Sequence, residues 1–218
     1  MHKLIAIALL AALPARVLAG DAFEQASSIA YEIIGAEFES PLCRPPPASD
    51  ARRQALVIAL ESVKTAELSD EVGLTPLHYA VVANDVPGMQ RLIEMGYRRD
   101  TRDIHGSTLL HAAALVGSVD ALSFLLAQGA DPNVRSRAGG TPLMDAASQN
   151  RPQLVWLLIS AGASAALRTD AGFSALHYAL QCKNPEVIGV LLDAGAPIDA
   201  KAKALSAKFG IELSAKER

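Results

Sequence analysis

Apolar residues between positions 89 and 192 recur in groups with the helical spacing i, i+3 and i+4. Four groups follow one another every 33 residues: Met89, Leu92 and Ile93; Leu122, Leu125 and Leu126; Val155, Leu158 and Ile159; Ile188, Leu191 and Leu192. This spacing places each group on one face of a helix. A glycine follows each group, at Gly96, Gly129, Gly162 and Gly195, where a left-handed residue can end the helix. The pattern predicts four equivalent amphipathic helices, none of which can bury its apolar stripe alone.

A second motif with the same period precedes each apolar stripe. Its members are Leu74-Thr75-Pro76-Leu77-His78, Ser107-Thr108-Leu109-Leu110-His111, Gly140-Thr141-Pro142-Leu143-Met144 and Phe173-Ser174-Ala175-Leu176-His177. The Thr or Ser can cap a helix, and proline is well suited to the first helical position that follows. An alanine lies on the packing side of each of these short helices, at Ala80, Ala113, Ala146 and Ala179. Each unit of 33 residues is therefore expected to contain two helices.

These motifs resemble those of the ankyrin repeat family, whose units carry the pattern T-P-L-H-x-A. The resemblance covers residues 70–201, and Leu109, Met144 and Ser174-Ala175 depart from the motif at the starts of their helices. It implies an all-α fold, an ankyrin-repeat solenoid of helix-turn-helix units with β-hairpin-like tips and helical caps. The four units are residues 70–102, 103–135, 136–168 and 169–201.

The chain outside the repeats divides into four segments. Residues 1–19 have a cationic start, an apolar stretch and small residues before Ala19, which is the pattern of a cleaved signal peptide. Residues 20–49 hold an amphipathic helix, with Phe23 and Phe38 at its two ends, and a proline-rich loop. Residues 50–69 read as an N-terminal capping helix preceded by Ser49. Residues 202–218 are expected to form a C-terminal cap and tail.

Composition and charge limit the classes of function. Half the residues are hydrophobic and 20% are charged, which excludes a disordered acidic polymer. The net charge of −3 argues against general nucleic-acid binding, so no nucleic acid is expected as a partner. The only long apolar run belongs to the signal segment, so no membrane span is expected in the mature chain. The signal resembles those of bacteria, which predicts cleavage after Ala19 and export to the periplasm.

No residue pattern for catalysis, cofactor binding or metal binding stands out, and the chain is not expected to be an enzyme. His78, His111 and His177 repeat with the helices, so about 10 Å separates each from the next. A single metal ion needs all its ligands about 2 Å away, which three histidines spaced in this way cannot provide. We expect each ring to tether turns within its own unit. Asp145 has no partner acid or base nearby in sequence and is interpreted as a surface charge.

Two cysteines, Cys43 and Cys182, fall at opposite ends of the predicted stack. An oxidising compartment would favour pairing them. However, four layers of about 10 Å separate the cap from the fourth unit. The residues from Cys43 to Ser49 extend only about 20 Å, and bridged Cα atoms must lie within about 7 Å. These distances predict that the two cysteines are not joined within one molecule.

The resemblance places partner-binding residues at the hairpin tips and on the outward side of the first helices. In this sequence those positions hold Val72, Leu74, Val82, Ile104, His105, Leu115, Val116, Arg137 and Phe173. A column of basic residues at one repeat position, Arg102, Arg135 and Arg168, is added to them as a further candidate for partner binding. The apolar members predict a partner surface. Alternatively, the N-terminal segment folds back over part of this groove. The basic column, which continues to Lys201, either attracts an acidic partner surface or consists of solvated charges beside the turns.

The resemblance implies that the partner is another protein, with an acidic patch that suits the basic column, bound by a monomer. The favoured function is a noncatalytic scaffold that is exported to the periplasm and serves as an accessory factor for a periplasmic protein or enzyme. The concave face of the solenoid would hold the partner. The alternative is an immunity-type inhibitor of a toxin that is delivered to the periplasm. Trp156, at a normally exposed position of its helix, is either a further contact or packs at the edge of the core.

Overall fold

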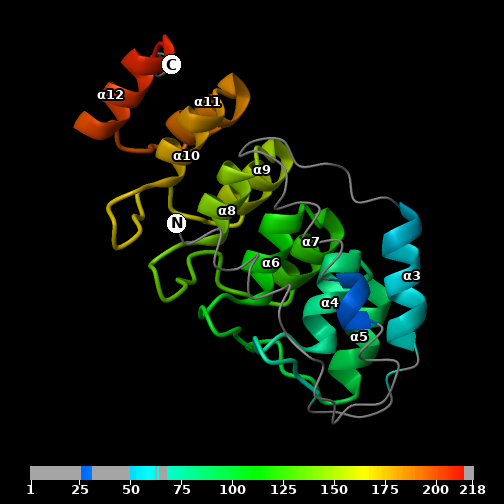
Figure 1. Cartoon of the computed structure of the whole chain (residues 1–218). Coiled ribbons are helices and arrows are strands. Elements are labelled where there is room, and N and C mark those ends of the chain that lie inside the picture. The colour runs from blue at the N-terminus through cyan, green and yellow to red at the C-terminus, as the bar shows by residue number, and fades with distance from the viewer. Residues whose placement is uncertain (1–25, 31–49, 62, 64–67, 214–218) are drawn as a thin grey trace.

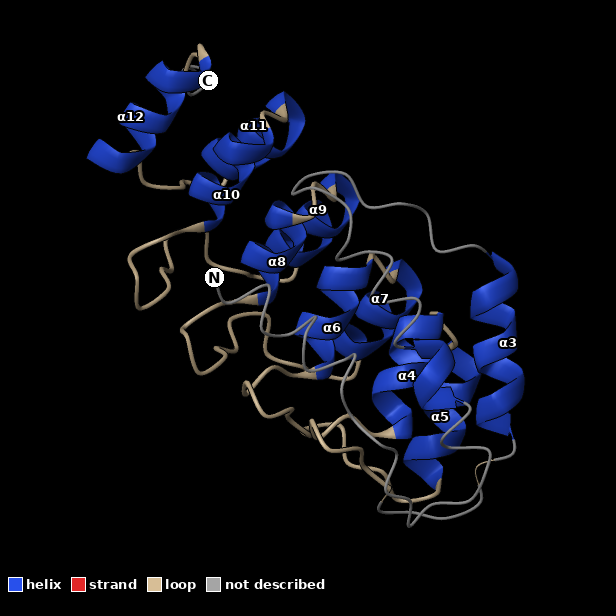
Figure 2. Cartoon of the chain, viewed as in Figure 1, coloured by secondary structure: helices blue, strands red, loops and turns tan. Residues whose placement is uncertain are grey.

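In the computed structural model of the protein, the described residues are 26–30, 50–61, 63 and 68–213. They form a stack of helix pairs that follow one another along the chain (Figure 1). The helices are α3 (Asp50–Glu61), α4 (Pro76–Ala83), α5 (Val86–Glu94), α6 (Leu109–Val116), α7 (Val119–Ala127), α8 (Pro142–Ser148), α9 (Pro152–Ser160), α10 (Ala175–Cys182), α11 (Pro185–Asp193) and α12 (Ala200–Phe209). Residues 26–30 are also helical. The loops that join successive units project to one side of the stack (Figure 2).

The first helix of each unit starts as the sequence predicts, with histidine in a capping role. The backbone N–H of Thr75 donates to Nδ1 of His78 at 3.1 Å, and Thr108 pairs with His111 in the same way. In the third unit Met144 replaces this histidine, and the Thr141 hydroxyl has no hydrogen-bond partner. The departures at Leu109 and Ala175 leave the cap intact, whereas the departure at Met144 is accompanied by the loss of both side-chain bonds of the cap.

The apolar stripes of the second helices form one continuous core with the small residues of the first helices. The first two members of every stripe are buried, and the third member is partly buried. The alanines of the first helices, which include Ala80 and Ala146, are fully buried. Small side chains let neighbouring first helices approach closely, while the leucines fill the space between layers. This confirms the prediction that the second helices supply the apolar stripes of the core and the first helices supply small packing residues.

The N-terminal end of the stack is covered by α3 and by residues 26–30. Leu56 and Leu60 of α3 are fully buried, and the Leu60 carbonyl accepts a hydrogen bond from Nη2 of Arg91 at 2.5 Å. Ala26 and Ala30 have an exposed fraction of 0% and belong to the same core. The signal segment 1–19 and the proline-rich loop lie outside the described residues.

The C-terminal cap begins slightly earlier than the sequence predicts. Helix α12 starts at Ala200, whereas the fourth unit was expected to run to residue 201 with the cap after it. The reason is Asp199, whose side chain accepts a hydrogen bond from the N–H of Ala202 and so starts the helix. Ala202 is fully buried, and Phe209 lies under the ammonium group of Lys183 at 4.8 Å. Helix α12 closes the last layer.

The prediction that Cys182 stays unpaired is wrong. Cys182, the last residue of α10, is disulfide-bonded. Because the chain contains two cysteines, its partner is Cys43, which lies outside the described residues. The prediction added layer spacings of about 10 Å along a straight line. Such a sum is an upper limit to the direct separation, because successive units of a solenoid are rotated as well as translated.

Candidate protein-binding surface

The hairpin tips of the four units are held together by backbone hydrogen bonds. The N–H of Ile104 donates to the Val72 carbonyl at 3.0 Å, and the N–H of Arg137 donates to the His105 carbonyl at 2.9 Å. A third bond of the same kind joins the fourth tip to the third. Among the described residues, the only paired β-bridge is that of Arg102 with Thr108, so the tips are hairpin-like turns without strands. This series of bonds, which we call the tip ladder, fixes each tip relative to its neighbours.

Each tip is also stabilised from within. Oδ1 of Asp103 accepts hydrogen bonds from the N–H groups of His105 and Ser107, both at 2.8 Å, and Asp70 plays the same part in the first unit. Gly139 takes a left-handed φ of +75° in the third tip. A Cβ there would lie 2.4 Å from Nη2 of Arg135, so any larger residue would displace this side chain. The tips are consequently preorganised.

The tip residues that the sequence singles out differ in exposure. Ile104 has 44% of its surface exposed, and the side chains of His105 and Arg137 are also exposed. Val72, Leu74 and Phe173 are partly buried. An isoleucine that projects from a rigid turn between a histidine and an arginine can enter an apolar pocket of a partner while its neighbours pair with polar groups.

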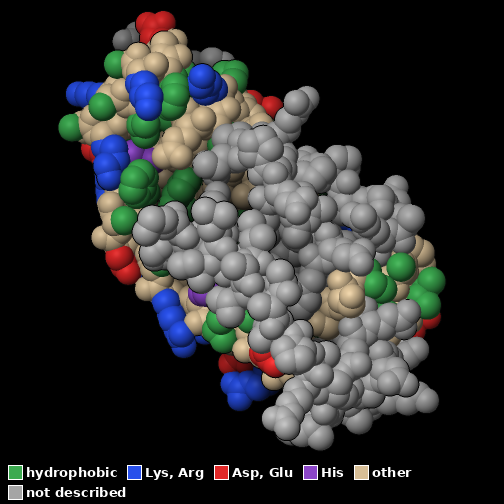
Figure 3. Space-filling view, viewed as in Figure 1, with side chains coloured by type: hydrophobic (Ala, Val, Ile, Leu, Met, Phe, Trp, Pro, Cys, Tyr) green, Lys and Arg blue, Asp and Glu red, His purple; other side chains and the backbone are tan. Residues whose placement is uncertain are grey.

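The basic column is engaged in bonds within the protein. Nη1 of Arg102 donates to the Gly106 carbonyl at 2.6 Å and to the Arg135 carbonyl of the next unit at 3.0 Å. Arg135 pairs with Asp170 at 3.3 Å. The ammonium group of Lys201 lies 3.8 Å above the ring of Phe173. Lys and Arg side chains still follow the margin of the molecule where the tips lie (Figure 3), so their positive charge remains at the surface.

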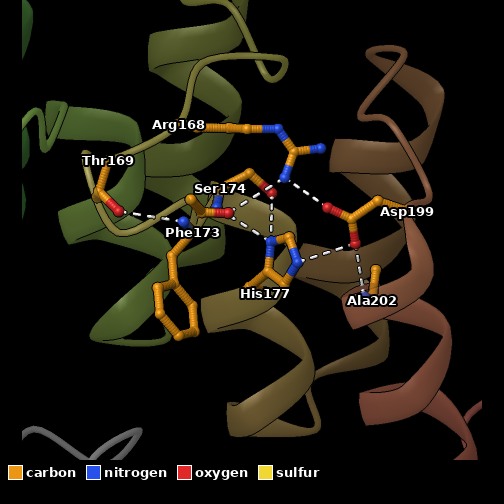
Figure 4. Close-up of polar contacts among 8 residues, drawn as sticks. Arg168, Thr169, Phe173, Ser174, His177, Asp199 and Ala202 are labelled. Carbon is orange, nitrogen blue, oxygen red and sulfur yellow. Dashed lines mark hydrogen bonds and ion pairs between the residues drawn. The ribbon is translucent and has the colours of Figure 1, made fainter.

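Arg168, the third arginine of this column, belongs to a cluster that joins the fourth unit to α12 (Figure 4). Its Nη1 lies 2.5 Å from Oδ2 of Asp199, and Oδ1 of Asp199 lies 3.1 Å from Nε2 of His177. Nδ1 of His177 must accept from the N–H of Ser174, since a backbone N–H can only donate. The neutral ring therefore carries its proton on Nε2 and donates it to Asp199. The hydrogen bond from the N–H of Ala202, and then the interactions with Arg168 and His177, lower the pKa of Asp199 to about 2.

We expect Asp199→Ala to detach the C-terminal cap. The substitution removes the cap of α12 and the acceptor for Arg168 and His177. Loss of a cap and of one charged hydrogen bond together costs about 2 kcal/mol. Limited proteolysis should then cut first within α12, before the repeats. The control is Asp193→Ala, which removes an exposed carboxylate from the end of α11. Equal cleavage of both variants would contradict the assigned role of Asp199.

The histidines act within the stack rather than as a shared site. Nε2 of His111 donates to the Gly140 carbonyl of the next unit at 3.2 Å, which matches the bond of His177 to Asp199. His78 has no partner for Nε2, and burial lowers its pKa to about 4. No group of three His, Cys, Asp or Glu side chains in the described ranges could hold a metal ion. The prediction that each ring tethers turns of its own unit is confirmed; His111 also reaches the next unit, and His177 reaches the residue that caps α12.

Two residues expected on the open concave face are buried. Val82 and Val116, at the ends of α4 and α6, each have an exposed fraction of 3%, whereas Leu115 is partly exposed. The expectation that Val82 and Val116 offer free apolar surface is therefore wrong. Tyr79 lies on the same side of α4 as Val82, because positions i and i+3 share a helix face. Its hydroxyl donates to Oδ2 of Asp70 at 2.5 Å and accepts from the hydroxyl of Ser27 at 3.0 Å, so residues 26–30 contact this side of the first unit.

Asp145 is largely buried in α8 and is not the surface charge that the sequence suggested. Burial, with a smaller effect from the Asp103 carboxylate, raises the pKa of Asp145 to about 8. Asp145 in turn adds to the effect of burial in raising the pKa of Tyr178, its equivalent one unit later. The sequence lacked any signal for this burial, because polar residues are common at outward positions of a first helix.

The sequence left open whether Trp156 packs at the edge of the core. With 59% of its surface exposed on α9, its side chain lies outside the core. The residues at the same repeat position are Ser123 and Gly189, so the indole has small neighbours on both sides. No helix in the part of the chain that the structure describes is long and apolar enough to cross a membrane.

Comparison with known proteins identifies the type of repeat. A family model described as ankyrin repeats (3 copies) matches residues 50–136 and, in a second match, residues 134–202. The matches run from the start of α3 into α12, so they include the N-terminal cap helix that lay outside the motif in the sequence. No curated protein matches the chain significantly.

Proposed function

The chain belongs to the ankyrin repeat family, and from this premise we propose that it is a noncatalytic protein-binding scaffold, exported to the periplasm as an accessory factor for a resident protein or enzyme. Ankyrin repeats mediate protein–protein interaction. A fold alone does not identify a partner, so the choice of surface must come from particular residues. The observation that carries the proposal is the tip ladder with Ile104, His105 and Arg137 exposed along it.

The geometry of the tips suits binding because little conformational freedom remains to be lost. The backbone bonds of the tip ladder and the Asp103 bonds hold the turns before any partner arrives. A preorganised surface loses less entropy on association than a flexible loop does. The surface arginines favour a partner with an acidic patch, and the groups that already pair with them limit this attraction to steering and orientation.

Export is supported by two observations of different kinds. The first is the pattern of residues 1–19, which predicts cleavage after Ala19. The second is the disulfide of Cys182, because disulfides persist in oxidising compartments such as the periplasm.

A noncatalytic role is favoured by the state of the titratable groups. The Nδ1 atoms of His78, His111 and His177 each accept a backbone hydrogen bond, so none can act as a base without breaking a helix cap. Asp145 has a raised pKa but occupies a helix face whose equivalent positions carry tyrosine and alanine rather than a nucleophile.

The tip surface is tested with the double variant Ile104→Asp/Arg137→Glu. Both side chains are exposed, so we expect wild-type thermal melting but binding at least about tenfold weaker, equivalent to about 1.4 kcal/mol. The measurement uses the wild-type protein to capture a partner from periplasmic extract, followed by calorimetry with that purified partner. The matched control is Trp156→Ser, which alters an exposed residue of α9.

The outcomes of this experiment separate the possible roles. Weaker binding by the tip variant alone supports the proposal, with a resident enzyme as captured partner. Capture of a toxin would instead support the inhibitor role. Full affinity in the tip variant together with loss in Trp156→Ser would contradict the tip surface and place the partner on the second helices.

A further inference from the structure

The repeats and the C-terminal cap carry different basic residues. Residues 70–182 contain eight arginines and no lysine, whereas residues 183–213 contain four lysines and no arginine. Lys183 follows α10, and the other three lysines, Lys201, Lys203 and Lys208, belong to α12. All four are exposed. The basic residue type therefore changes where the stack ends.

The two sets of basic residues also differ in their contacts within the protein. Each of the eight arginines donates at least one hydrogen bond from its guanidinium group to a backbone carbonyl or another side chain. None of the four lysines makes a side-chain hydrogen bond or ion pair with another described residue. Lys183 and Lys208 lie over the ring of Phe209, which leaves their ammonium groups otherwise open to water. The arginines hold the stack together, and the lysines provide charge that is free to attract a partner.

Helix α12 places this charge around a shallow apolar face at the end of the stack (Figure 1). Its inward side carries the buried Ala202, and the exposed residues of its outward side are Ala200, Ala204 and Ala207. Lys201 and Lys208 are seven residues apart, about two helical turns, so they flank the alanines on one side while Lys203 flanks them on the other. Lysine side chains extend beyond alanine, and Figure 3 shows several basic side chains over this end of the molecule.

The acidic residues of this end lie outside the lysine-flanked face or are already paired. Helix α12 itself contains no acidic residue. Asp199 is held by the cluster drawn in Figure 4, with Arg168 and His177 as its partners. Glu186 and Asp193 lie near the two ends of α11, and Glu212 follows α12. The face is thus locally positive although the whole chain has a net charge of −3.

This chemistry fits an anionic lipid surface better than a protein. Protein interfaces are depleted in lysine, and their energy centres on an aromatic or arginine side chain that fills a pocket. The outward side of α12 has no such anchor, because Phe209 is partly buried beneath two ammonium groups. Lysine is a strongly hydrated point charge that needs no fixed bonding geometry. Each lysine near an anionic bilayer strengthens binding about fivefold.

We propose that α12 and Lys183 form a docking surface for a bilayer that contains anionic phospholipids. The ammonium groups face the lipid phosphates, and the alanines let the helix lie close to the headgroups. The binding is reversible, because no long apolar side chain projects from this face into the hydrocarbon. The stack would attach by its C-terminal end, with the tip ladder at its side open to a protein partner (Figure 2). This inference concerns the cap and does not rest on the proposed function.

Sedimentation with lipid vesicles tests the proposal on the full mature chain. We expect the protein to bind vesicles of phosphatidylcholine with roughly one-third phosphatidylglycerol, and not vesicles of phosphatidylcholine alone. Raising the salt concentration from about 0.01 M to about 1 M shortens the Debye length from about 30 Å to about 3 Å and should release the protein. Failure to bind the anionic vesicles, or equal binding to both kinds, would overturn the proposal.

The double variant Lys203→Gln/Lys208→Gln removes one charge from each side of the alanine face. We expect its partition coefficient on the anionic vesicles to be about 25-fold lower, a factor of about five for each lysine. Lys203→Arg/Lys208→Arg keeps both charges and should bind as the wild type does. Thermal melting verifies that the variants are folded; if the glutamine variant is not, the arginine variant and the lipid and salt dependence of the wild type decide the question.

The matched control is Arg98→Gln/Arg99→Gln, which changes the net charge by the same amount at exposed positions far from α12. This control should bind the anionic vesicles as the wild type does. An equal loss in the control and in the lysine variant would show a response to net charge alone and would overturn the docking surface. Capture of a soluble acidic protein through the lysines, without binding to vesicles, would also overturn the proposal and assign the face to a protein.

Discussion

Val116→Asp should lower the free energy of unfolding by about 3 kcal/mol or more, because it places a charge where a nearly inaccessible valine packs. The neighbouring substitution Leu115→Asp should lower the free energy of unfolding by about 1 kcal/mol. Leu115 is partly exposed, so the carboxylate of the introduced aspartate can remain in contact with water. Both changes introduce the same group at adjacent positions of α6, so the change in net charge is matched, and the greater loss of helix propensity falls on Leu115→Asp. Urea denaturation followed by circular dichroism measures the difference.

This pair of variants also determines how a loss of partner binding should be interpreted. A simultaneous change of Leu115 and Val116 would unfold the second unit, and lost binding would then say nothing about contact. Leu115→Asp alone remains folded and probes the concave face. If Val116→Asp were as stable as Leu115→Asp, the end of α6 would be open to water, contrary to the burial of Val116.

The stability of the protein should fall between pH 4 and pH 8 by about 2–5 kcal/mol on account of Asp145. The folded-state pKa of Asp145 is about 8, whereas an aspartate in an unfolded chain has a pKa of about 3.9. Between these values the folded protein holds a proton that the unfolded chain has lost. Raising the pH therefore favours unfolding until the folded protein also loses this proton.

Asp145→Asn isolates this effect, because an amide is neutral at every pH. We expect the variant to match the wild type near pH 4.5 and to exceed it increasingly toward pH 8. His78, with a folded-state pKa of about 4, acts in the opposite sense and reduces stability as the pH falls below 6.5. It is present in both proteins and cancels in the difference. Asp193→Asn, at an exposed position, is the control. A difference that does not change with pH would show that Asp145 is ionised in the folded protein.

The 33-residue period was enough to predict the helix pairs, their caps and their core. The i, i+3 and i+4 groups had to face inward because no single unit can bury its own stripe, and the same constraint acts at every repeat. The histidine caps and the αL glycines are local features, set by residues three or four positions apart. The start of α12 was misplaced, because Asp199 could serve either as the end of one unit or as the cap of the next helix.

Tertiary structure decided the accessibility of the candidate residues. Val82 and Val116 occupy positions that are open in an isolated repeat, and Asp145 occupies one where a charge is usual, so their burial arises only in the folded protein. The partners of Arg102 and Arg168 belong to the next unit or to α12. The disulfide of Cys182 is likewise a contact that the layer spacing did not predict. A repeated sequence determines the contacts that recur in every unit, whereas contacts made once, between the repeats and the rest of the chain, depend on the path of the whole chain.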